Sequence, residues 1–342
     1  MSRLARENEH TGGDNMLKSR TTLLTILSLI LLTASPLPCL AQTSQAQDTT
    51  VKDNKNKVKK TYTGTPVLWR EPTDIESRNL LLGAGGETMK PDLSRVTFIE
   101  EKKGGWSTKY RVRDGAGNEW IAKLGKEAQT DTAANRLVWA VGYESEIAYL
   151  VPHLTITGKG TFDNVRLEAR PKEVKRTGTW MWDDNPFKGT RELQGLKIMM
   201  ALINNWDMKD ENNQILASRG ETTGGELRYI VSDLGGSFGK TGGIISRSRN
   251  KPSDYVKGEF IKAVKGDRVD VNYGGKNKKL FDDLTVQDAK WIAGYLVRLS
   301  DDQIKDAFRA ANYAPEDVEQ LARAVRERIN ALTRISANTT TD

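Results

Sequence analysis

Two short polar stretches constrain this chain more than any other feature of its sequence. The first, Asp207-Met208-Lys209-Asp210-Glu211-Asn212, follows an apolar run with the spacing of a helix. The second, Asp233-Leu234-Gly235, ends a run of β-branched and aromatic residues. One loop therefore carries a carboxylate, an amine and an amide, and a second carboxylate follows a predicted strand.

Helical spacing is clearest just before the first of these stretches. Residues 191–204 place Leu193, Leu196, Met200 and Ile203 on one face. The C-terminal third predicts three further helices, over residues 285–299, 301–311 and 315 to about 332. Pro315 and the acids after it suit the first turn of the last helix.

The preceding part of the chain has a β pattern. Glycine-containing turns separate three short predicted antiparallel strands, residues 96–99, 110–113 and 119–123. A helix over residues 130–142 follows, with Thr130 or Asp131 as its cap and Gly142 at its end. A further β region runs from about residue 154 to 174.

This order of elements predicts an α+β fold with two lobes. We expect a β-rich N-lobe over residues 66–178, a mainly helical C-lobe over 179–335 and a disordered tail over 336–342. A ligand is expected in the cleft between the lobes.

The N-terminus has the pattern of a secretory signal peptide. Lys18 and Arg20 precede an uncharged apolar run, residues 23–32, and Cys39-Leu40-Ala41 offers a small-residue cleavage site. We expect a signal peptide over residues 1–41, a flexible linker over 42–65, and a mature protein in the periplasm or outside the cell. An uncleaved anchor and lipidation at Cys39 are the less favoured alternatives.

Cleavage after Ala41 restricts the chemistry of the mature chain. Cys39 is the only cysteine, so disulfides, thiol nucleophiles and cysteine-bound zinc are excluded. His153 is the only histidine beyond the leader, and we expect it to be a packing residue. Carboxylates, amides and lysines remain as chemical groups.

These remaining groups suit phosphoryl transfer. That reaction needs a lysine on the donor phosphates, oxygen ligands for Mg²⁺ and a carboxylate to orient the attacking hydroxyl. Lys123 ends the strand Trp120-Ile121-Ala122-Lys123, and the two polar stretches supply Asp-x-Lys-x-x-Asn and Asp-Leu-Gly. In this order the motifs resemble those of the protein-kinase-like fold, whose third strand carries Val-Ala-Ile-Lys.

The resemblance implies a role for each candidate residue. Asp207 would be the catalytic carboxylate, and Lys209 would neutralise the transferred phosphate. Asn212 and Asp233 would bind Mg²⁺ or Mn²⁺. The remaining positions would bind ATP or another nucleotide: Lys123, its acidic partner Asp131 (with Glu127 as second choice), and Gly104 and Gly105 of a short glycine loop.

The chain also departs from the pattern of typical protein kinases. Asn205-Trp206 stands where His-Arg is expected, Leu234 replaces Phe, Ala-Pro-Glu does not occur, and only two glycines form the glycine loop. These departures are similar to the atypical branches: phosphatidylinositol-kinase-like, HipA-like and secretory-pathway kinases.

The leading hypothesis is therefore an exported, monomeric phosphotransferase, for phosphoryl or nucleotidyl groups, that acts on an unknown protein or small molecule. An inactive pseudokinase or binding module is the alternative. Residues 240–279 contain eleven Lys or Arg and four acids, in a chain of net charge +7. This basic segment is a solvated face or selects an acidic acceptor; docking on a glycan, a lipid headgroup or nucleic acid is less favoured.

Overall fold

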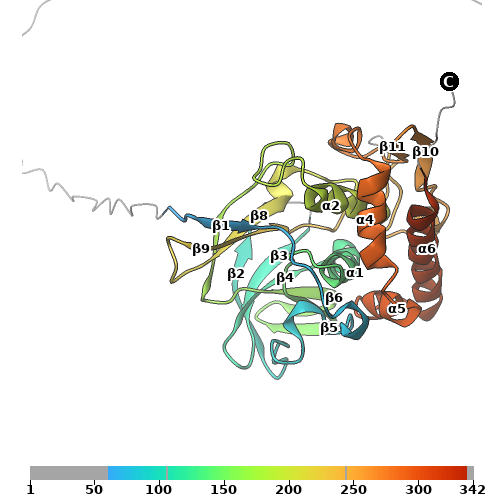
Figure 1. Ribbon diagram of the computed structural model, residues 1–342. Coiled ribbons are helices and arrows are strands. Elements are labelled where there is room, and N and C mark those ends of the chain that lie inside the picture. Colours follow the sequence, from blue (N-terminus) through green and yellow to red (C-terminus); the bar gives the residue numbers. More distant parts are fainter. Residues whose placement is uncertain (1–60, 105–106, 243–244, 337–342) are drawn as a thin grey trace, which may run out of the picture. The chain divides into compact units, whose positions relative to one another are not determined.

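The computed structural model of the chain describes residues 61–104, 107–242 and 245–336 (Figure 1). The predicted signal peptide, nearly all of the predicted linker and most of the predicted tail lie outside these residues. Within them, no helix combines the length and the apolar character needed to span a bilayer.

A closed five-stranded barrel forms the first part of the described chain. Its strand order is β2-β3-β4-β6-β5, and the β2–β5 pair is the parallel one. Apolar side chains such as Val112, Trp120 and Leu167 fill the interior. The strands are β2 (Val96–Lys102), β3 (Lys109–Arg113), β4 (Glu119–Lys123), β5 (Ala148–Thr157) and β6 (Gly160–Ala169).

Helix α1 (Glu127–Ala140) follows β4 and contacts β5 and β6. It begins three residues before the predicted start, and neither Thr130 nor Asp131 caps it, so that expectation was wrong. Both side chains are buried within the helix, where Thr130 Oγ1 donates to the carbonyl of Gly235 (3.0 Å). Their polar atoms serve tertiary contacts instead of the helix end.

A second, four-stranded sheet has the order β1-β9-β8-β7. Strand β1 runs parallel to β9, while β7–β8 and β8–β9 are antiparallel. The outer strands of this sheet come from the two ends of the predicted N-lobe, so that region is not confined to the barrel. The strands are β1 (Gly64–Val67), β7 (Val174–Gly178), β8 (Asn213–Ser218) and β9 (Gly225–Val231).

The rest of the described chain is mainly helical, close to the predicted ranges. Side-chain caps at Thr285 and Ser300 start α4 and α5 as capping boxes, and Thr190 caps α2. These helices and α1 share one large apolar core. The helices are α2 (Arg191–Leu202), α4 (Val286–Leu296), α5 (Asp301–Arg309) and α6 (Pro315–Arg334).

The basic segment, residues 240–279, contains elements that the sequence pattern did not predict. They are helix α3 (Pro252–Val256) and the hairpin β10 (Ile261–Lys265) and β11 (Arg268–Val271). Single 3-10 turns elsewhere are η1 (Ile75–Ser77), η2 (Gly83–Gly85), η3 (Asp210–Asn212) and η4 (Lys278–Phe281).

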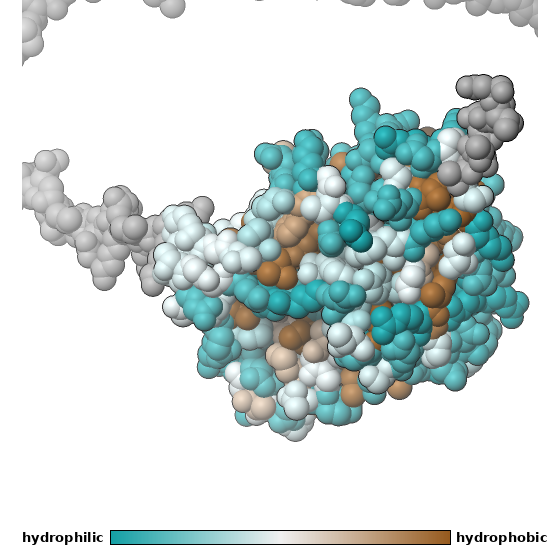
Figure 2. Space-filling model, viewed as in Figure 1, coloured by the Kyte–Doolittle hydropathy of each residue, from teal (hydrophilic) through white to brown (hydrophobic). Residues whose placement is uncertain are grey.

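The predicted α+β class is confirmed, with a sheet-rich N-terminal part and a mainly helical C-terminal part. The face in Figure 2 is mostly hydrophilic, and apolar residues appear on it only as scattered patches. The packing role expected for His153 was wrong. Its side chain is exposed on β5, where Nδ1 lies 2.6 Å from Asp163 Oδ1.

Candidate active site

Lys123 lies at the centre of a buried cluster of carboxylates. Its Nζ atom is 2.9 Å from Asp131 Oδ2, 2.9 Å from Asp233 Oδ1 and 3.4 Å from Glu127 Oε2. The lysine side chain is 3% exposed and that of Asp131 1%, whereas Asp233 remains 33% exposed. Asp233 is therefore the member of this cluster that solvent or a ligand reaches.

Local structure explains why these side chains meet. Alternate residues of a strand face opposite ways, so Trp120 and Ala122 enter the barrel core while Lys123 points outward. Glu127 and Asp131 are one turn apart on α1 and share the face that turns toward Lys123. Asp233 arrives from the end of β9.

The charges of Lys123 and Asp233 are stabilised by their surroundings. Burial lowers the pKa of Lys123, but the negative charges of Asp131, Asp233 and Glu127 outweigh this effect and raise it overall. Burial likewise raises the pKa of Asp233. The charge of Lys123, its hydrogen bond and the Gly235 N–H outweigh that burial and lower the pKa to about 2. Both groups are therefore ionised at neutral pH.

A buried arginine extends this cluster and was missed in the sequence. Arg166 Nη1 lies 3.5 Å from Asp131 Oδ2 and 2.7 Å from Glu168 Oε2. Glu168 also pairs with Arg170 and with Arg176, the latter at 2.7 Å. The available signal was the alternation Arg166-x-Glu168-x-Arg170, whose first two residues share one face of β6, where Arg166 is the register partner of Lys123.

The first polar stretch forms a separate cluster around Asp207. Its carboxylate is 23% exposed, with Lys276 Nζ at 2.8 Å from Oδ1 and Lys209 Nζ at 3.3 Å from Oδ2. The side-chain amide of Asn212 donates to the carbonyl of Asp207 (2.7 Å), which closes the loop. Lys209, Asn212 and Asp207 therefore lie together, as their spacing suggested.

The turn that begins at Asp233 joins the two clusters. Ser232 N donates to the carbonyl of Asn212 (2.8 Å), so Asn212 lies beside the start of this turn. Leu234 N donates to Asp131 Oδ1 (3.2 Å), and Trp206 N donates to the carbonyl of Gly236 (3.4 Å). The backbone thereby fixes Asp233 between Lys123 and the Asp207 loop.

Both glycines of this turn are required by close packing. A Cβ atom on Gly235 would lie 2.8 Å from Glu127 Cβ and 3.1 Å from Lys123 Nζ. A Cβ atom on Gly236 would lie 2.9 Å from Asn205 Oδ1 and 3.2 Å from Asp207 Cβ. The turn therefore packs against both clusters, and side chains there would separate them.

Asn212 and Asp233 each have a side-chain oxygen atom of the kind that Mg²⁺ prefers. Asp233 Oδ1 accepts from Lys123 and Gly235 N, and among the described residues no contact involves Oδ2. The Asn212 amide donates through Nδ2, which leaves Oδ1 as a possible ligand. No group of three or more His, Cys, Asp or Glu side chains suited to a metal occurs in the described chain. Mg²⁺ commonly uses one or two carboxylates, waters and substrate phosphates instead.

The predicted glycine loop is only partly described. Gly104 has a φ of +101°, and a Cβ atom there would meet nothing within 4 Å. Gly105 lies outside the described residues. Just beyond it, Ser107 Oγ donates to Glu127 Oε2 (2.6 Å), which connects the β2–β3 turn to the Lys123 cluster.

Neither a protein-family model nor a curated protein sequence matches this chain. Among solved structures, the chain is similar to the proinflammatory kinase CtkA of Helicobacter pylori. The TM-score is 0.44 at 12% identity, over 71% of this chain and 97% of that one. It is also similar to the Rio2 kinase of Chaetomium thermophilum in its ADP/Mg²⁺-phosphoaspartate complex. There the TM-score is 0.31 at 11% identity, over 70% of this chain and 72% of that one.

Proposed function

We propose that this chain is a kinase-like phosphotransferase that uses a nucleotide and Mg²⁺. The observation that best supports this proposal is the position of Asp233, whose Oδ1 lies 2.9 Å from Lys123 Nζ. The turn after it packs against the Asp207 loop. Lys123, the oxygen ligands of Asn212 and Asp233, and the partly exposed carboxylate of Asp207 thus lie in one region, as phosphoryl transfer requires.

Each residue has a proposed role that follows from its surroundings. Lys123 is held by Asp131 and would direct its charge at the donor phosphates. Asn212 and Asp233 would hold Mg²⁺, which neutralises phosphate charge when bound. Asp207 would orient the acceptor hydroxyl, because its carboxylate is within reach of solvent. Lys209 and Lys276 would balance the negative charge that gathers beside it.

One observation favours the alternative, a module that binds without catalysis. Three carboxylates enclose the ammonium group of Lys123, which leaves that side chain 3% exposed. A phosphate can reach Nζ only if Asp233 turns from the lysine toward a metal. A protein in which this exchange does not occur would bind partners without transferring phosphate.

Transfer assays separate these two functions. The protein is incubated with ATP or GTP, labelled at the α or the γ phosphate, and Mg²⁺ or Mn²⁺. We expect label on the protein itself or on an added acidic protein such as casein, from the γ position for phosphoryl transfer and from the α position for nucleotidyl transfer. Asp233→Ala and Asp207→Ala should abolish it, while the exposed Asp163→Ala should not. Equal labelling in all four proteins would reject the proposal.

Export remains part of the proposal and is supported by the leader pattern of residues 18–41. The expected result is a mature chain, shortened by cleavage near Ala41, in the periplasmic or extracellular fraction. Intact-mass measurement of the fractionated protein tests this, and a full-length cytoplasmic chain would contradict it.

A further inference from the structure

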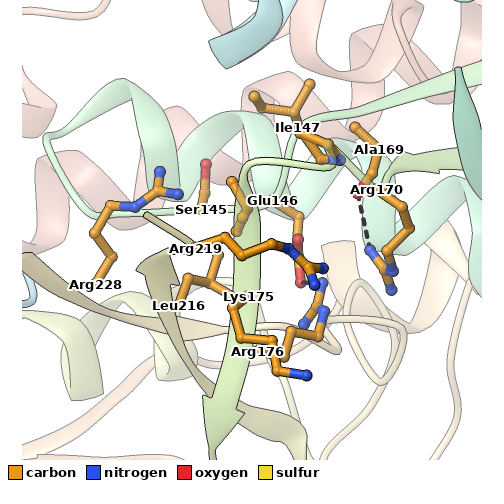
Figure 3. Close-up of a pocket in the computed structure, with 12 residues that line it drawn as sticks. Ser145, Glu146, Ile147, Ala169, Arg170, Lys175, Arg176, Leu216, Arg219 and Arg228 are labelled. Atoms are coloured by element: carbon orange, nitrogen blue, oxygen red, sulfur yellow. Dashed lines mark hydrogen bonds and ion pairs between the residues drawn. The ribbon is translucent and has the colours of Figure 1, made fainter. Parts of the chain in front are cut away.

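A cavity of about 230 Å³ lies beside the proposed active site, between the barrel and the four-stranded sheet (Figure 3). The segment before β5, the end of β6 and strands β7, β8 and β9 all contribute to its wall. The charged residues of its lining are mostly positive. Five cationic residues and one carboxylate, Glu146, line it; the cations are Arg170, Lys175, Arg176, Arg219 and Arg228.

Two of the five cations are already neutralised. Arg176 Nη2 lies 2.6 Å from Glu146 Oε1 and 2.7 Å from Glu168 Oε1, and Arg170 also pairs with Glu168. These contacts fix the two guanidinium groups in place. They also occupy both nearby carboxylates.

The other three cations have few contacts with negatively charged groups. Lys175 forms no ion pair in the described part of the chain, and Arg219 donates only from Nε, to the carbonyl of Lys172 (2.7 Å). Arg228 lies 3.8 Å from Glu144, a long ion pair. In Figure 3, Arg176 and Arg219 project toward the middle of the pocket, with Arg170 on one side and Arg228 on the other. The pocket therefore presents unused N–H donors and an excess of positive charge.

Apart from Ser145, the rest of the wall is apolar, and this strengthens the attraction for an anion. It is formed by Ile147, Ala169, Pro171, Val174 and Leu216. Charges interact more strongly beside such a low-dielectric wall than in bulk water. Guanidinium groups also match phosphate oxygens in pairs, which makes arginine a preferred phosphate ligand. An adjoining cavity of about 510 Å³ shares Arg170 and Arg219 and adds Lys172. It also adds Lys102 and Arg111, which are paired with Glu100 and Glu119.

We propose that this pocket binds a phosphate group of a small-molecule ligand. The pocket is coupled to the proposed active site through Ser232, whose Oγ donates to Glu146 Oε1 (2.6 Å) and which directly precedes Asp233. A ligand held here would reach the phosphotransfer centre, either as the nucleotide or as a phosphorylated acceptor. Only this link rests on the proposed function, since the binding of phosphate does not require transfer.

Isothermal titration of the full chain with inorganic pyrophosphate, without Mg²⁺, tests the proposal. The test variant is Lys175→Ala with Arg219→Ala. The matched control is Lys265→Ala with Arg268→Ala, which removes the same two residue types from the β10–β11 hairpin. Arg268, like Arg219, donates to a backbone carbonyl (2.6 Å, to Asp283). Thermal melting checks that both variants are folded.

We expect the test variant to bind pyrophosphate at least about tenfold more weakly, because hydrogen bonds to charged groups are lost, and the control to bind as the wild type does. Absence of wild-type binding would overturn the proposal. Equal weakening in both variants would also overturn it, since general surface charge would then explain the binding.

Two further arms separate this proposal from the proposed function and identify the source of the phosphate. Asp233→Ala should retain pyrophosphate binding even if it loses Mg²⁺-dependent nucleotide binding. Loss of both would place the pyrophosphate site at Asp233 and would overturn the proposal that the pocket binds phosphate. Competition between pyrophosphate and Mg²⁺-ADP assigns the pocket to the nucleotide. Simultaneous binding of the two assigns it to a separate phosphorylated acceptor.

Discussion

The two charged clusters on either side of the Leu234-Gly235-Gly236 turn differ in burial and in how firmly they are held. Around Lys123 the ions are mostly buried, and Asp131 contacts both Lys123 and Arg166. Around Asp207 the side chains are half-exposed, and two lysines share one carboxylate. The first cluster is therefore part of the folded core, whereas the second is free to exchange its partners for a ligand.

The largest expected effect of this difference is on the free energy of unfolding when one carboxylate is removed. Asp131→Ala should lower the free energy of unfolding by about 3–5 kcal/mol, because it leaves Lys123 and Arg166 as buried charges without that partner. Asp207→Ala should lower it by less than about 1 kcal/mol, since its partners remain hydrated. Urea denaturation of both variants measures this contrast, and similar losses would show that the clusters do not differ in this way.

The turn between the clusters should tolerate a larger side chain poorly. Gly235→Ala should cost about 1–3 kcal/mol, the usual range for overpacking, because its Cβ would lie 2.8 Å from Glu127 Cβ. Gly220→Ala is the matched control, since a Cβ there meets nothing within 4 Å. Thermal unfolding of the two variants measures the difference. A Gly235→Ala protein as stable as the control would mean that the turn does not pack tightly on α1.

Acid should destabilise the folded protein through Asp233. Its pKa is lowered from 3.8 to about 2 in the folded state. A carboxylate with a lowered folded pKa stabilises the protein above its unfolded pKa, and this contribution is lost as the pH falls toward the folded value. Stability of the wild type should therefore fall between pH 3.8 and about 2 more steeply than that of Asp233→Asn. Parallel curves for the two proteins would contradict the Lys123–Asp233 pairing.

The smallest effect is expected for the lysines beside Asp207. Lys276→Ala should change stability by less than about 1 kcal/mol, the usual value of an exposed ion pair. The difference from wild type should shrink further in high salt, because salt screens exposed charges. Denaturant titrations at low and high ionic strength test this. A large, salt-insensitive loss would place Lys276 in a buried network like that of Lys123.

The sequence predicted those parts of the molecule whose signals are local. Helix α2 follows from its apolar spacing, and the capping residues Thr285 and Ser300 lie close to the predicted starts of α4 and α5. The sequence also predicts Asp131 as the partner of Lys123, because Asp131 lies at the predicted start of the helix that follows the strand. The predicted helix start was nevertheless late, since Lys126 at the true start gives no side-chain cap to recognise.

Contacts between distant segments were not predictable in the same way. Strand β1 pairs with β9 in parallel, and nothing within the short run Gly64–Val67 indicates that partner. The burial of the β6 charges was also not predictable, because alternating Arg and Glu in a strand resemble a solvated face. They are buried here because Arg166 and Glu168 neutralise each other and their neighbours.

Calorimetric titration of the full chain with Mg²⁺-nucleotide tests the proposed site at Asp233 most directly. Lys123, Asp233 and Asn212 should act together, so wild-type binding should require Mg²⁺ and should be lost in Asp233→Ala, with Asp163→Ala as the unaffected control. Binding that is absent from the wild type, or that persists unchanged in Asp233→Ala, would contradict a magnesium-phosphate site at the end of β9.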